Sequence, residues 1–186
     1  DGDLGGGVIE RLNRCVLRLQ RLTKPVIGSI NGVAVGAGCN IALAADLRIA
    51  SDTARFGEVF TCVGLVPDGG GTYFLPRLVG TAKAMELMLL ADIIDAQEAL
   101  CIGLVNWVVP SDQLQDETQK LAERLAQGPT LAYGLVKTGL YQSLTMPLED
   151  VLNMEARNQA MAARSQDRAE GVAAFREKRQ PRFLGH

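Results

Sequence analysis

The sequence predicts a single α/β domain, and three features support this prediction. Short apolar runs typical of buried strands occur at residues 26–30, 47–50 and 104–109. Between them, apolar side chains recur at helical spacing, so strands and helices alternate along the chain. Past Val109 the pattern is helical with almost no strand, which predicts a helical region that packs on the core or on a neighbouring subunit.

The elements of the first half follow from periodicity and from turn residues. Residues 1–7 are polar and glycine-rich, and we expect a loop there. An apolar stripe predicts an amphipathic helix at 8–22, and its arginine-rich face is better explained by solvation than by phosphate contact. The elements expected next are a strand at 26–30, a buried helix from about Gly38, a strand at 47–50, a turn or short helical segment at 51–55, a loop with a short strand at 56–66 and a turn at 67–72.

The second half is predicted to be helical apart from the strand at 104–109. Pro76 is expected to limit the helix that begins at Tyr73, because proline lacks a backbone N–H. Thr81 is the expected cap of the next helix, and Gly103 closes the one after it. The predicted helices span 73–79 in part, 81–90, 95–102, 114–126, 131–143, 148–164 and 167–178.

Composition indicates an ordinary globular protein. The chain has 186 residues, 47% of them apolar and 22% charged. Its formal net charge of −2 provides no basic field for nucleic acid or anionic lipid. No apolar run reaches the ~20 residues that a membrane span needs, and we expect no signal peptide. The expected location is the cytoplasm or an organelle matrix, with neither nucleic acid nor a membrane as a partner.

The cysteines and the single histidine limit the kinds of catalytic and metal sites that this chain can form. Cys15, Cys39, Cys62 and Cys101 are far apart, so we expect reduced, buried thiols and neither disulfides nor a zinc site. The only histidine is His186 at the end of the chain, which excludes most Ser-His or Cys-His catalysis and most histidine-bound metals within it. We therefore expect no metal site, and any base should be a carboxylate.

The stretch 25–76 organises the rest of the chain. After the first predicted strand, Gly32, Gly36 and Gly38 allow sharp turns and a close approach of a ligand to the backbone. A strand, a glycine loop and a helix N-terminus together direct free N–H groups at one point, which attracts negative charge. The alternative is that these small residues serve only helix–strand packing. Neither a complete GxGxxG pattern nor a P-loop is present.

Two carboxylates are candidates for acid–base chemistry. Asp68 lies in a glycine-rich turn after an apolar segment, and Glu58 lies ten residues upstream. A carboxylate beside an apolar pocket has a raised pKa and can carry a proton. The alternatives are that aspartate simply favours turns and that Glu58 is a surface loop residue.

Several motifs in this order resemble the enoyl-CoA hydratase/isomerase (crotonase) family. They are Asn31-Gly-Val-Ala-Val-Gly-Ala-Gly38, Ala45-Asp-Leu-Arg-Ile-Ala50, Phe56-Gly57, Gly64-Leu-Val-Pro67, Gly69-Gly-Gly-Thr72, Leu75-Pro-Arg-Leu-Val-Gly80, Gly103-Leu-Val-Asn106 and Glu170-Gly-Val-Ala-Ala-Phe175. The resemblance extends from Lys24 to the C-terminus.

This resemblance implies a fold and a substrate class. The family has a ClpP-like spiral core of ββα units and a helical C-terminal trimerisation region, and it binds acyl-CoA thioesters. Residues 1–110 would form the C-terminal part of the spiral core, with its N-terminal strands expected outside this sequence, and residues 111–186 the oligomerisation region. A homotrimer or a dimer of trimers is implied, with coenzyme A as part of the substrate and no separate cofactor.

The resemblance also assigns a site for the thioester. In the family, two backbone N–H groups hold the thioester oxygen as it becomes an enolate, and by position Ala37 supplies the second. The first donor belongs to a loop expected to precede this sequence. Such preorganised donors stabilise charge where it develops. Further substrate contacts are implied at Gly36, Gly38, Phe60, Val63, Phe175 and Lys178, although a solvated basic tail is the alternative for Lys178.

The residues at the family's catalytic positions favour an isomerase. Its hydratases use two glutamates, and Asn40 and Phe60 stand at those positions here. Syn-hydration needs a held water and a delivered proton, which an Asn–Phe pair does not provide. Asp68 matches the single acid/base of the ring-epoxide and Δ3–Δ2 isomerase branch of the phenylacetyl-CoA degradation type. It would move a proton between two carbons while Ala37 holds the enolate, with Glu58 as a second candidate.

Three other functions stay open. A hydratase-type lyase remains an alternative because the family includes many. An aspartate near position 68 attacks covalently in the related aryl-CoA dehalogenases, but the terminal place of His186 disfavours that chemistry. A non-catalytic, trimeric CoA-binding or scaffold protein is the non-enzyme alternative, since both hydratase glutamates are absent.

Overall fold

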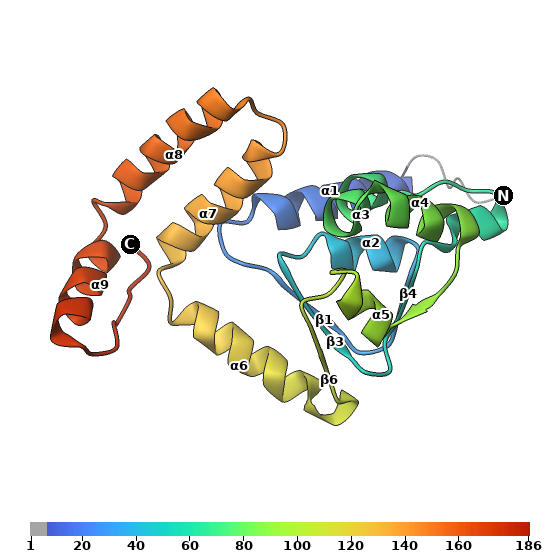
Figure 1. The fold of residues 1–186 in the computed structure, drawn as a ribbon, viewed down its shortest axis with the longest axis horizontal. Coiled ribbons are helices and arrows are strands. Elements are labelled where there is room, and N and C mark those ends of the chain that lie inside the picture. The colour runs from blue at the N-terminus through green and yellow to red at the C-terminus, as the bar shows by residue number, and fades with distance from the viewer. Residues whose placement is uncertain (1–6) are drawn as a thin grey trace. The chain divides into compact units, whose positions relative to one another are not determined.

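The computed structural model describes residues 7–186, which fall into two compact units (Figure 1). Of these residues, the first unit contains 7–20 and 26–119, and the second contains 21–25 and 120–186. The loop predicted at residues 1–7 lies outside the described residues except for Gly7, which is helical. The division predicted at residue 110 stays a prediction.

The α/β prediction is confirmed by two small sheets in the first unit. The first sheet is parallel throughout and has the spatial order β1 (Ile27–Ile30), β3 (Leu47–Ser51) and β6 (Trp107–Val109). The second has the order β2 (Val33–Val35), β4 (Arg55–Gly57) and β5 (Ile94–Asp95). In it, β2 and β4 are parallel, whereas β4 and β5 are antiparallel.

Helices cover the strands, and all of them except the long first helix come after the first strand. Those of the first unit are α1 (Gly7–Arg21), α2 (Ala37–Leu43), η1 (Val59–Val63), α3 (Gly71–Val79), α4 (Thr81–Leu90), α5 (Ala96–Cys101) and η2 (Ser111–Gln113). Helix α2 contacts β1, β2 and α3, and therefore lies at the centre of the unit (Figure 1). The largest fully buried apolar side chains are Phe56, Leu43, Leu75 and Leu104. Burial of each such side chain stabilises the fold by roughly 1.5–3 kcal/mol.

Arg48 on β3 ties the first sheet to the segment before β6. Its side chain is buried, and its Nε donates to the carbonyl of Leu104 at 2.7 Å. One guanidinium nitrogen donates to the carbonyl of Ala45 at 2.5 Å, and the backbone N–H of Arg48 donates to Asn106 Oδ1 at 2.8 Å. Since a buried charge is costly without such bonds, this network fixes the segment between α5 and β6 against the sheet.

Two predicted helix boundaries are corrected. Helix α3 does not weaken at Pro76 but continues to Val79. Phe74 and Leu75 are buried on this helix, and their burial offsets the backbone bond that proline removes. Residue Gly80, and not Thr81, is the N-cap of α4.

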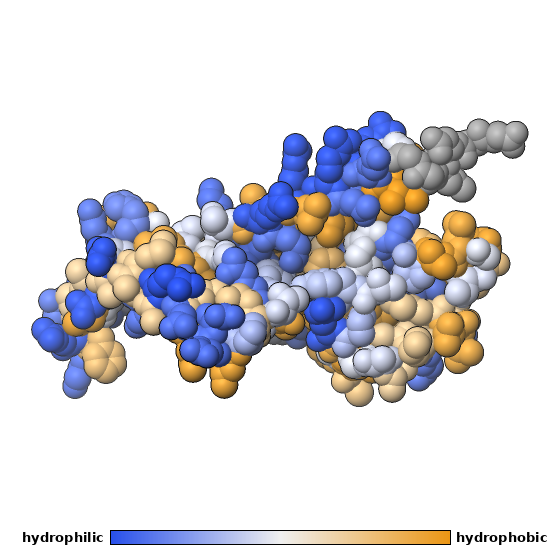
Figure 2. Space-filling view, turned by 90° about the horizontal axis from the view of Figure 1, so that it is seen from above, coloured by the Kyte–Doolittle hydropathy of each residue, from blue (hydrophilic) through white to orange (hydrophobic). Residues whose placement is uncertain are grey.

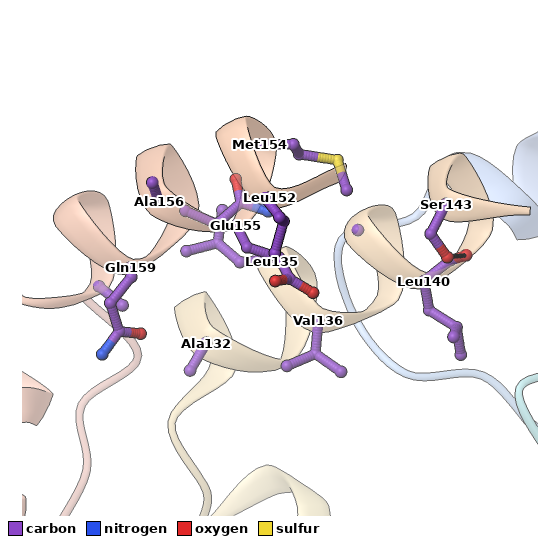
Figure 3. A pocket seen from close by; sticks show the side chains of 13 residues that line it. Ala132, Leu135, Val136, Leu140, Ser143, Leu152, Met154, Glu155, Ala156 and Gln159 are labelled. Carbon is purple, nitrogen blue, oxygen red and sulfur yellow. Dashed lines mark hydrogen bonds between the residues drawn. The ribbon is translucent and has the colours of Figure 1, made fainter. Parts of the chain in front are cut away.

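The second unit is helical. Helix α6 (Leu114–Ala126) ends in it, and α7 (Thr130–Ser143), α8 (Leu148–Ala162) and α9 (Gln166–Glu177) follow. Helices α7 and α8 lie side by side (Figure 1), with an apolar groove between them that is lined by Leu135, Leu140 and Leu152, among others (Figure 3). No helix among residues 7–186 combines the length and the apolar character needed to cross a membrane.

The last residues are held against α9. Asp167 accepts hydrogen bonds from the backbone N–H groups of Leu184, at 2.6 Å, and Gly185, at 2.9 Å. The two carboxylate oxygens of Glu170 lie 2.6 and 2.9 Å from the guanidinium nitrogens of Arg179. The tail predicted at the C-terminus is therefore an ordered part of the second unit.

Apolar side chains also lie on the surface of the first unit. Figure 2 shows them gathered at the end where η1 and α4 lie in Figure 1. The most exposed of these side chains are Val63, Val66, Leu89 and Leu90. The role predicted for Val63 in substrate binding stays a prediction.

Candidate active site

A glycine turn forms the entrance to α2. Gly36 has φ 55° and ψ −130°, a backbone conformation that favours glycine, and its N–H donates to the carbonyl of Gly57 at 2.9 Å. The chain therefore turns from β2 directly into α2, whose first residue is Ala37. The N–H of a first helical residue has no acceptor within its own helix. A Cβ added at Gly38 would meet nothing within 4 Å, so the backbone is open there.

Asn40, in the first turn of α2, joins two segments that are distant in sequence. It is fully buried, and its Nδ2 donates to the main-chain oxygen of Asp68 at 2.9 Å. The same nitrogen lies 3.5 Å from Glu58 Oε2. The amide of Asn40 thus holds the turn that carries Asp68 and the segment that carries Glu58 together.

Glu58 follows β4 and is buried, with 2% of its surface exposed. The alternative interpretation of Glu58 as a surface loop residue is therefore wrong. Burial raises the pKa of this carboxyl to about 7, and the charge of Asp68 adds to the rise, while hydrogen bonds from Asn40 and Cys39 oppose it. At neutral pH, Glu58 is therefore poised between its neutral and ionised forms.

Asp68 lies in the turn between η1 and α3 and is half-buried. Its backbone is followed by Gly69 and Gly70, both with positive φ, which turn the chain into α3. One carboxylate oxygen, Oδ1, is buried and has no hydrogen-bond partner. A buried carboxylate oxygen without a donor is able to take up a proton from a ligand placed beside it.

An aromatic ring lies beside the glycine turn. Phe60 on η1 is 9% exposed, and its ring lies 3.6 Å from the position that a Cβ at Gly36 would occupy. The ring therefore provides an apolar wall next to the start of α2.

The four cysteines are free, as expected, but only Cys39 is buried. The prediction of buried thiols is wrong for Cys15, Cys62 and Cys101, which lie on the exposed sides of short or amphipathic helices. Burial raises the pKa of Cys39 to about 12, and the charge of Glu58 adds to that rise. The Cys39 thiol is therefore protonated at neutral pH and is no nucleophile.

The structure brings several of the predicted site residues together in the first unit, whereas two others belong to the second unit. Asn40, Glu58 and Asp68 meet at the start of α2, with Phe60 beside the turn that precedes Ala37. Residues Phe175 and Lys178 belong to the second unit; Phe175 is 85% exposed, and Lys178 caps α9 with positive φ. Their contacts with a substrate stay predictions. Among the described residues, no group of three or more His, Cys, Asp or Glu side chains is placed to hold a metal ion.

The connecting function of Asn40 was not predicted from the sequence. Its position was interpreted only as the loss of a glutamate. A polar residue between apolar residues in the first turn of the predicted helix was the available signal, because such a side chain must find partners when it is buried.

Comparisons with known proteins agree with this architecture. The family model for enoyl-CoA hydratase/isomerase matches residues 7–186. The 1,2-epoxyphenylacetyl-CoA isomerase of Escherichia coli is 44% identical over 183 residues, which cover 98% of this chain and 70% of that protein. The crotonyl-CoA hydratase of Syntrophomonas wolfei is 40% identical over 174 residues, covering 93% of this chain and 67% of that protein. The crystal structure of an enoyl-CoA hydratase from Bacillus anthracis has a TM-score of 0.93 at 34% identity, covering 99% of this chain and 74% of that one.

Proposed function

Because the chain belongs to the enoyl-CoA hydratase/isomerase (crotonase) family, we propose that it is an acyl-CoA isomerase acting through a thioester enolate. Asp68 is the acid/base, and the N–H of Ala37 holds the thioester oxygen while negative charge develops on it. The observation that carries this proposal is the buried Oδ1 of Asp68, which lacks a partner.

The reaction balances without a further reactant. A C–H bond of the acyl chain breaks, its proton passes to Asp68, and its electron pair delocalises into the thioester as an enolate. The electrons then form a new C–H bond at a second carbon with the same proton, which shifts the double bond and regenerates the carboxylate of Asp68. A rearrangement of a ring epoxide on an acyl-CoA is the second substrate class proposed.

The site supports isomerisation over hydration. The amide of Asn40 already bonds to the main chain at Asp68, and the Phe60 ring faces the glycine turn. Neither side chain can activate a water molecule as a carboxylate does. A hydratase is the second candidate, because Glu58 and Asp68 provide two carboxyl groups on segments that Asn40 holds together through the side chain of Glu58 and the main chain of Asp68.

The test is the substitution Asp68→Asn. The purified protein is assayed for conversion of a 3-enoyl-CoA to the 2-enoyl-CoA and for exchange of α-protons of an acyl-CoA with deuterated water. We expect both rates to fall by about 10²–10⁴-fold, because the proton carrier is removed. Asp116→Asn, at an exposed position of α6, is the matched control and should leave both rates unchanged.

The other outcomes separate the competing functions. Undiminished turnover in Asp68→Asn would remove Asp68 from the mechanism. Addition of water to a 2-enoyl-CoA without isomerisation would favour the hydratase. Absence of exchange with every enoyl-CoA and ring-epoxide substrate would favour a non-catalytic CoA-binding protein.

The family also suggests partners and a location. We propose an acyl-CoA thioester as the ligand, with coenzyme A as part of the substrate, and a homotrimer or a dimer of trimers as the assembly. Phe175 and Lys178 would then contact the coenzyme A of a neighbouring subunit. Among its relatives are bacterial enzymes and a mitochondrial methylglutaconyl-CoA hydratase of Rattus norvegicus, so the cytoplasm or an organelle matrix is the proposed location.

A further inference from the structure

Three buried oxygens near the start of α2 lack hydrogen-bond partners. They are Asn40 Oδ1, Glu58 Oε1 and Asp68 Oδ1, from three separate segments of the first unit. Asn40 and Glu58 are 0% and 2% exposed, so bulk water does not solvate them. Buried acceptors without donors are energetically costly, and this cluster has too few hydrogen-bond donors for its acceptor oxygens.

The neighbouring hydrogen-bond donors do not satisfy these three oxygens. The Nδ2 group of Asn40 is directed at the main-chain oxygen of Asp68, at 2.9 Å, and at Glu58 Oε2, at 3.5 Å. The thiol of Cys39 faces Glu58 and is only a weak donor. The titratable groups that face Glu58 are thus Cys39 on α2 and Asp68 before α3, and neither is a cation. A proton on Glu58 itself would add a strong donor to the cluster.

We propose that Glu58 is a positioning residue that acts in its protonated form, so that in the active state of the enzyme Asp68 carries the only negative charge of the cluster. This inference rests on the proposed function of Asp68. The carboxyl O–H of Glu58 donates to an acceptor oxygen of the cluster and is not transferred to the substrate. Asp68 alone moves the proton between carbons, and Glu58 ends each turnover as it began.

Like-charge repulsion gives the reason for this arrangement. Two carboxylates that share a buried site cannot both ionise at low cost, and the more buried one keeps its proton. Here Glu58 is buried, and Asp68 is half-buried. A second negative charge beside Asp68 would also oppose formation of the negatively charged enolate.

The direction of the pH dependence follows. Burial and the charge of Asp68 raise the pKa of Glu58 to about 7. Below this pKa, Glu58 is neutral and the site has one carboxylate. As the pH rises through it, Glu58 ionises, and turnover should decline by up to about tenfold for each further pH unit.

The test compares the pH profiles of turnover in the wild type and in Glu58→Gln. Glutamine keeps the shape and supplies a permanent donor, so kcat near pH 6 should stay within about fivefold of the wild type, and the decline above neutral pH should disappear. Glu58→Ala removes the donor and should lower kcat near pH 6 about tenfold relative to the wild type, with little effect on KM and without the decline above neutral pH. Glu149→Gln, at an exposed position of α8, is the matched control and should retain the decline.

Infrared spectroscopy gives a readout that does not depend on turnover. The carbonyl stretch of a neutral carboxylic acid should be present in the folded wild type at about pH 6, disappear by about pH 8 and be absent at both pH values in Glu58→Gln. This result would support a protonated Glu58 even if Asp68→Asn contradicted the proposed isomerase.

Two outcomes would overturn the inference. If Glu58→Gln keeps the wild-type decline and the infrared band, then Glu58 is not the titrating group. If folded Glu58→Gln loses more than about 100-fold at every pH, its proton is transferred during the reaction and Glu58 is a catalytic residue. Both differ from failure of the proposed function, which is measured by Asp68→Asn.

Discussion

Gly71 gives Asn40 the space that its side chain needs. A Cβ at position 71 would lie 2.6 Å from both Nδ2 and Oδ1 of Asn40, closer than packed atoms approach. Asn40 could turn away only by losing its bonds to Asp68 and Glu58. A glycine in the first turn of α3 is thus part of the geometry of the candidate site.

We therefore expect Gly71→Ala to destabilise the protein and to lower isomerase turnover. The loss should be about 1–3 kcal/mol, because buried groups of Asn40 are left without partners. Alanine favours helices, so propensity alone would act in the opposite direction. Chemical denaturation measures the free energy of unfolding, and Gly32→Ala is the control, since a Cβ there meets nothing within 4 Å. Equal stability of the two variants would contradict the described placement of Asn40.

At the scale of single residues, the sequence predicted the candidate acid–base residues but not the contacts that they make. Asp68 and Glu58 were found from residue type and turn context. Asn40 is separated from them by 28 and 18 residues, and no local pattern reports a contact across such distances. The raised pKa of Glu58 likewise depends on burial that only the packed fold creates.

Among the elements, the long helices and the strands β1 and β3 were predicted well, whereas the shortest strands, β2 and β5, were not. Helix α6 spans Leu114–Ala126 as predicted, because its amphipathic pattern repeats over several turns. Strands β2 and β5 have three and two residues, too few for an alternating pattern. They form because β4 offers hydrogen-bonding edges on both sides, which is information from the tertiary fold.

Glu170 on α9 bonds to Arg179 and Arg182 of the C-terminal tail, and we call these contacts the clasp. The clasp gives a prediction about how firmly the tail is held. The backbone N–H of Arg182 donates to Glu170 Oε1 at 2.7 Å, and Arg179 pairs with the same carboxylate. Glu170→Gln removes the charge, so the amide of Arg182 should exchange with deuterium several-fold faster. Glu155→Gln, at an exposed position of α8, is the control, and equal exchange in both variants would show that the clasp does not hold the tail.

The same contacts determine how the stability of the tail on α9 changes with pH. The Arg179 guanidinium lowers the pKa of Glu170 from an ordinary value of 4.5 to about 2. The stabilisation from this pair is therefore fully present above the unfolded pKa, and it is lost as the pH falls through the folded pKa. Exchange at Arg182 in the wild type should approach that of Glu170→Gln only in strong acid.

For the whole molecule, the resemblance predicted more than the residue patterns did. Alternating strands and helices indicated only the α/β class. The order of eight motifs indicated the family, which the match over residues 7–186 confirms. Spiral topology could not come from periodicity, because strands of two to five residues carry no information about their partners.

The assembly is the property to test at this scale. Helices α7 and α8 expose Val136, Leu140 and Leu152 (Figure 3), and a second copy of the chain is the occupant that the proposed trimer provides. Sedimentation should give three or six copies in the wild type. Leu140→Glu should give smaller species, because an unpaired buried carboxylate is costly. Gln142→Glu, at an exposed position of α7, is the control, and a wild type that is monomeric at all concentrations would contradict the trimer.

The parallel order β1-β3-β6 has a consequence for how the chain acquires its structure. Residue 27 pairs with residue 47, whereas residue 49 pairs with residue 107, so the second pairing closes a loop nearly three times as long. Longer closures cost more entropy, and distant pairings form more slowly. During synthesis, β6 is made about 60 residues after β3. Until then, the edge of β3 that β6 will cover has no partner and is able to pair with other chains.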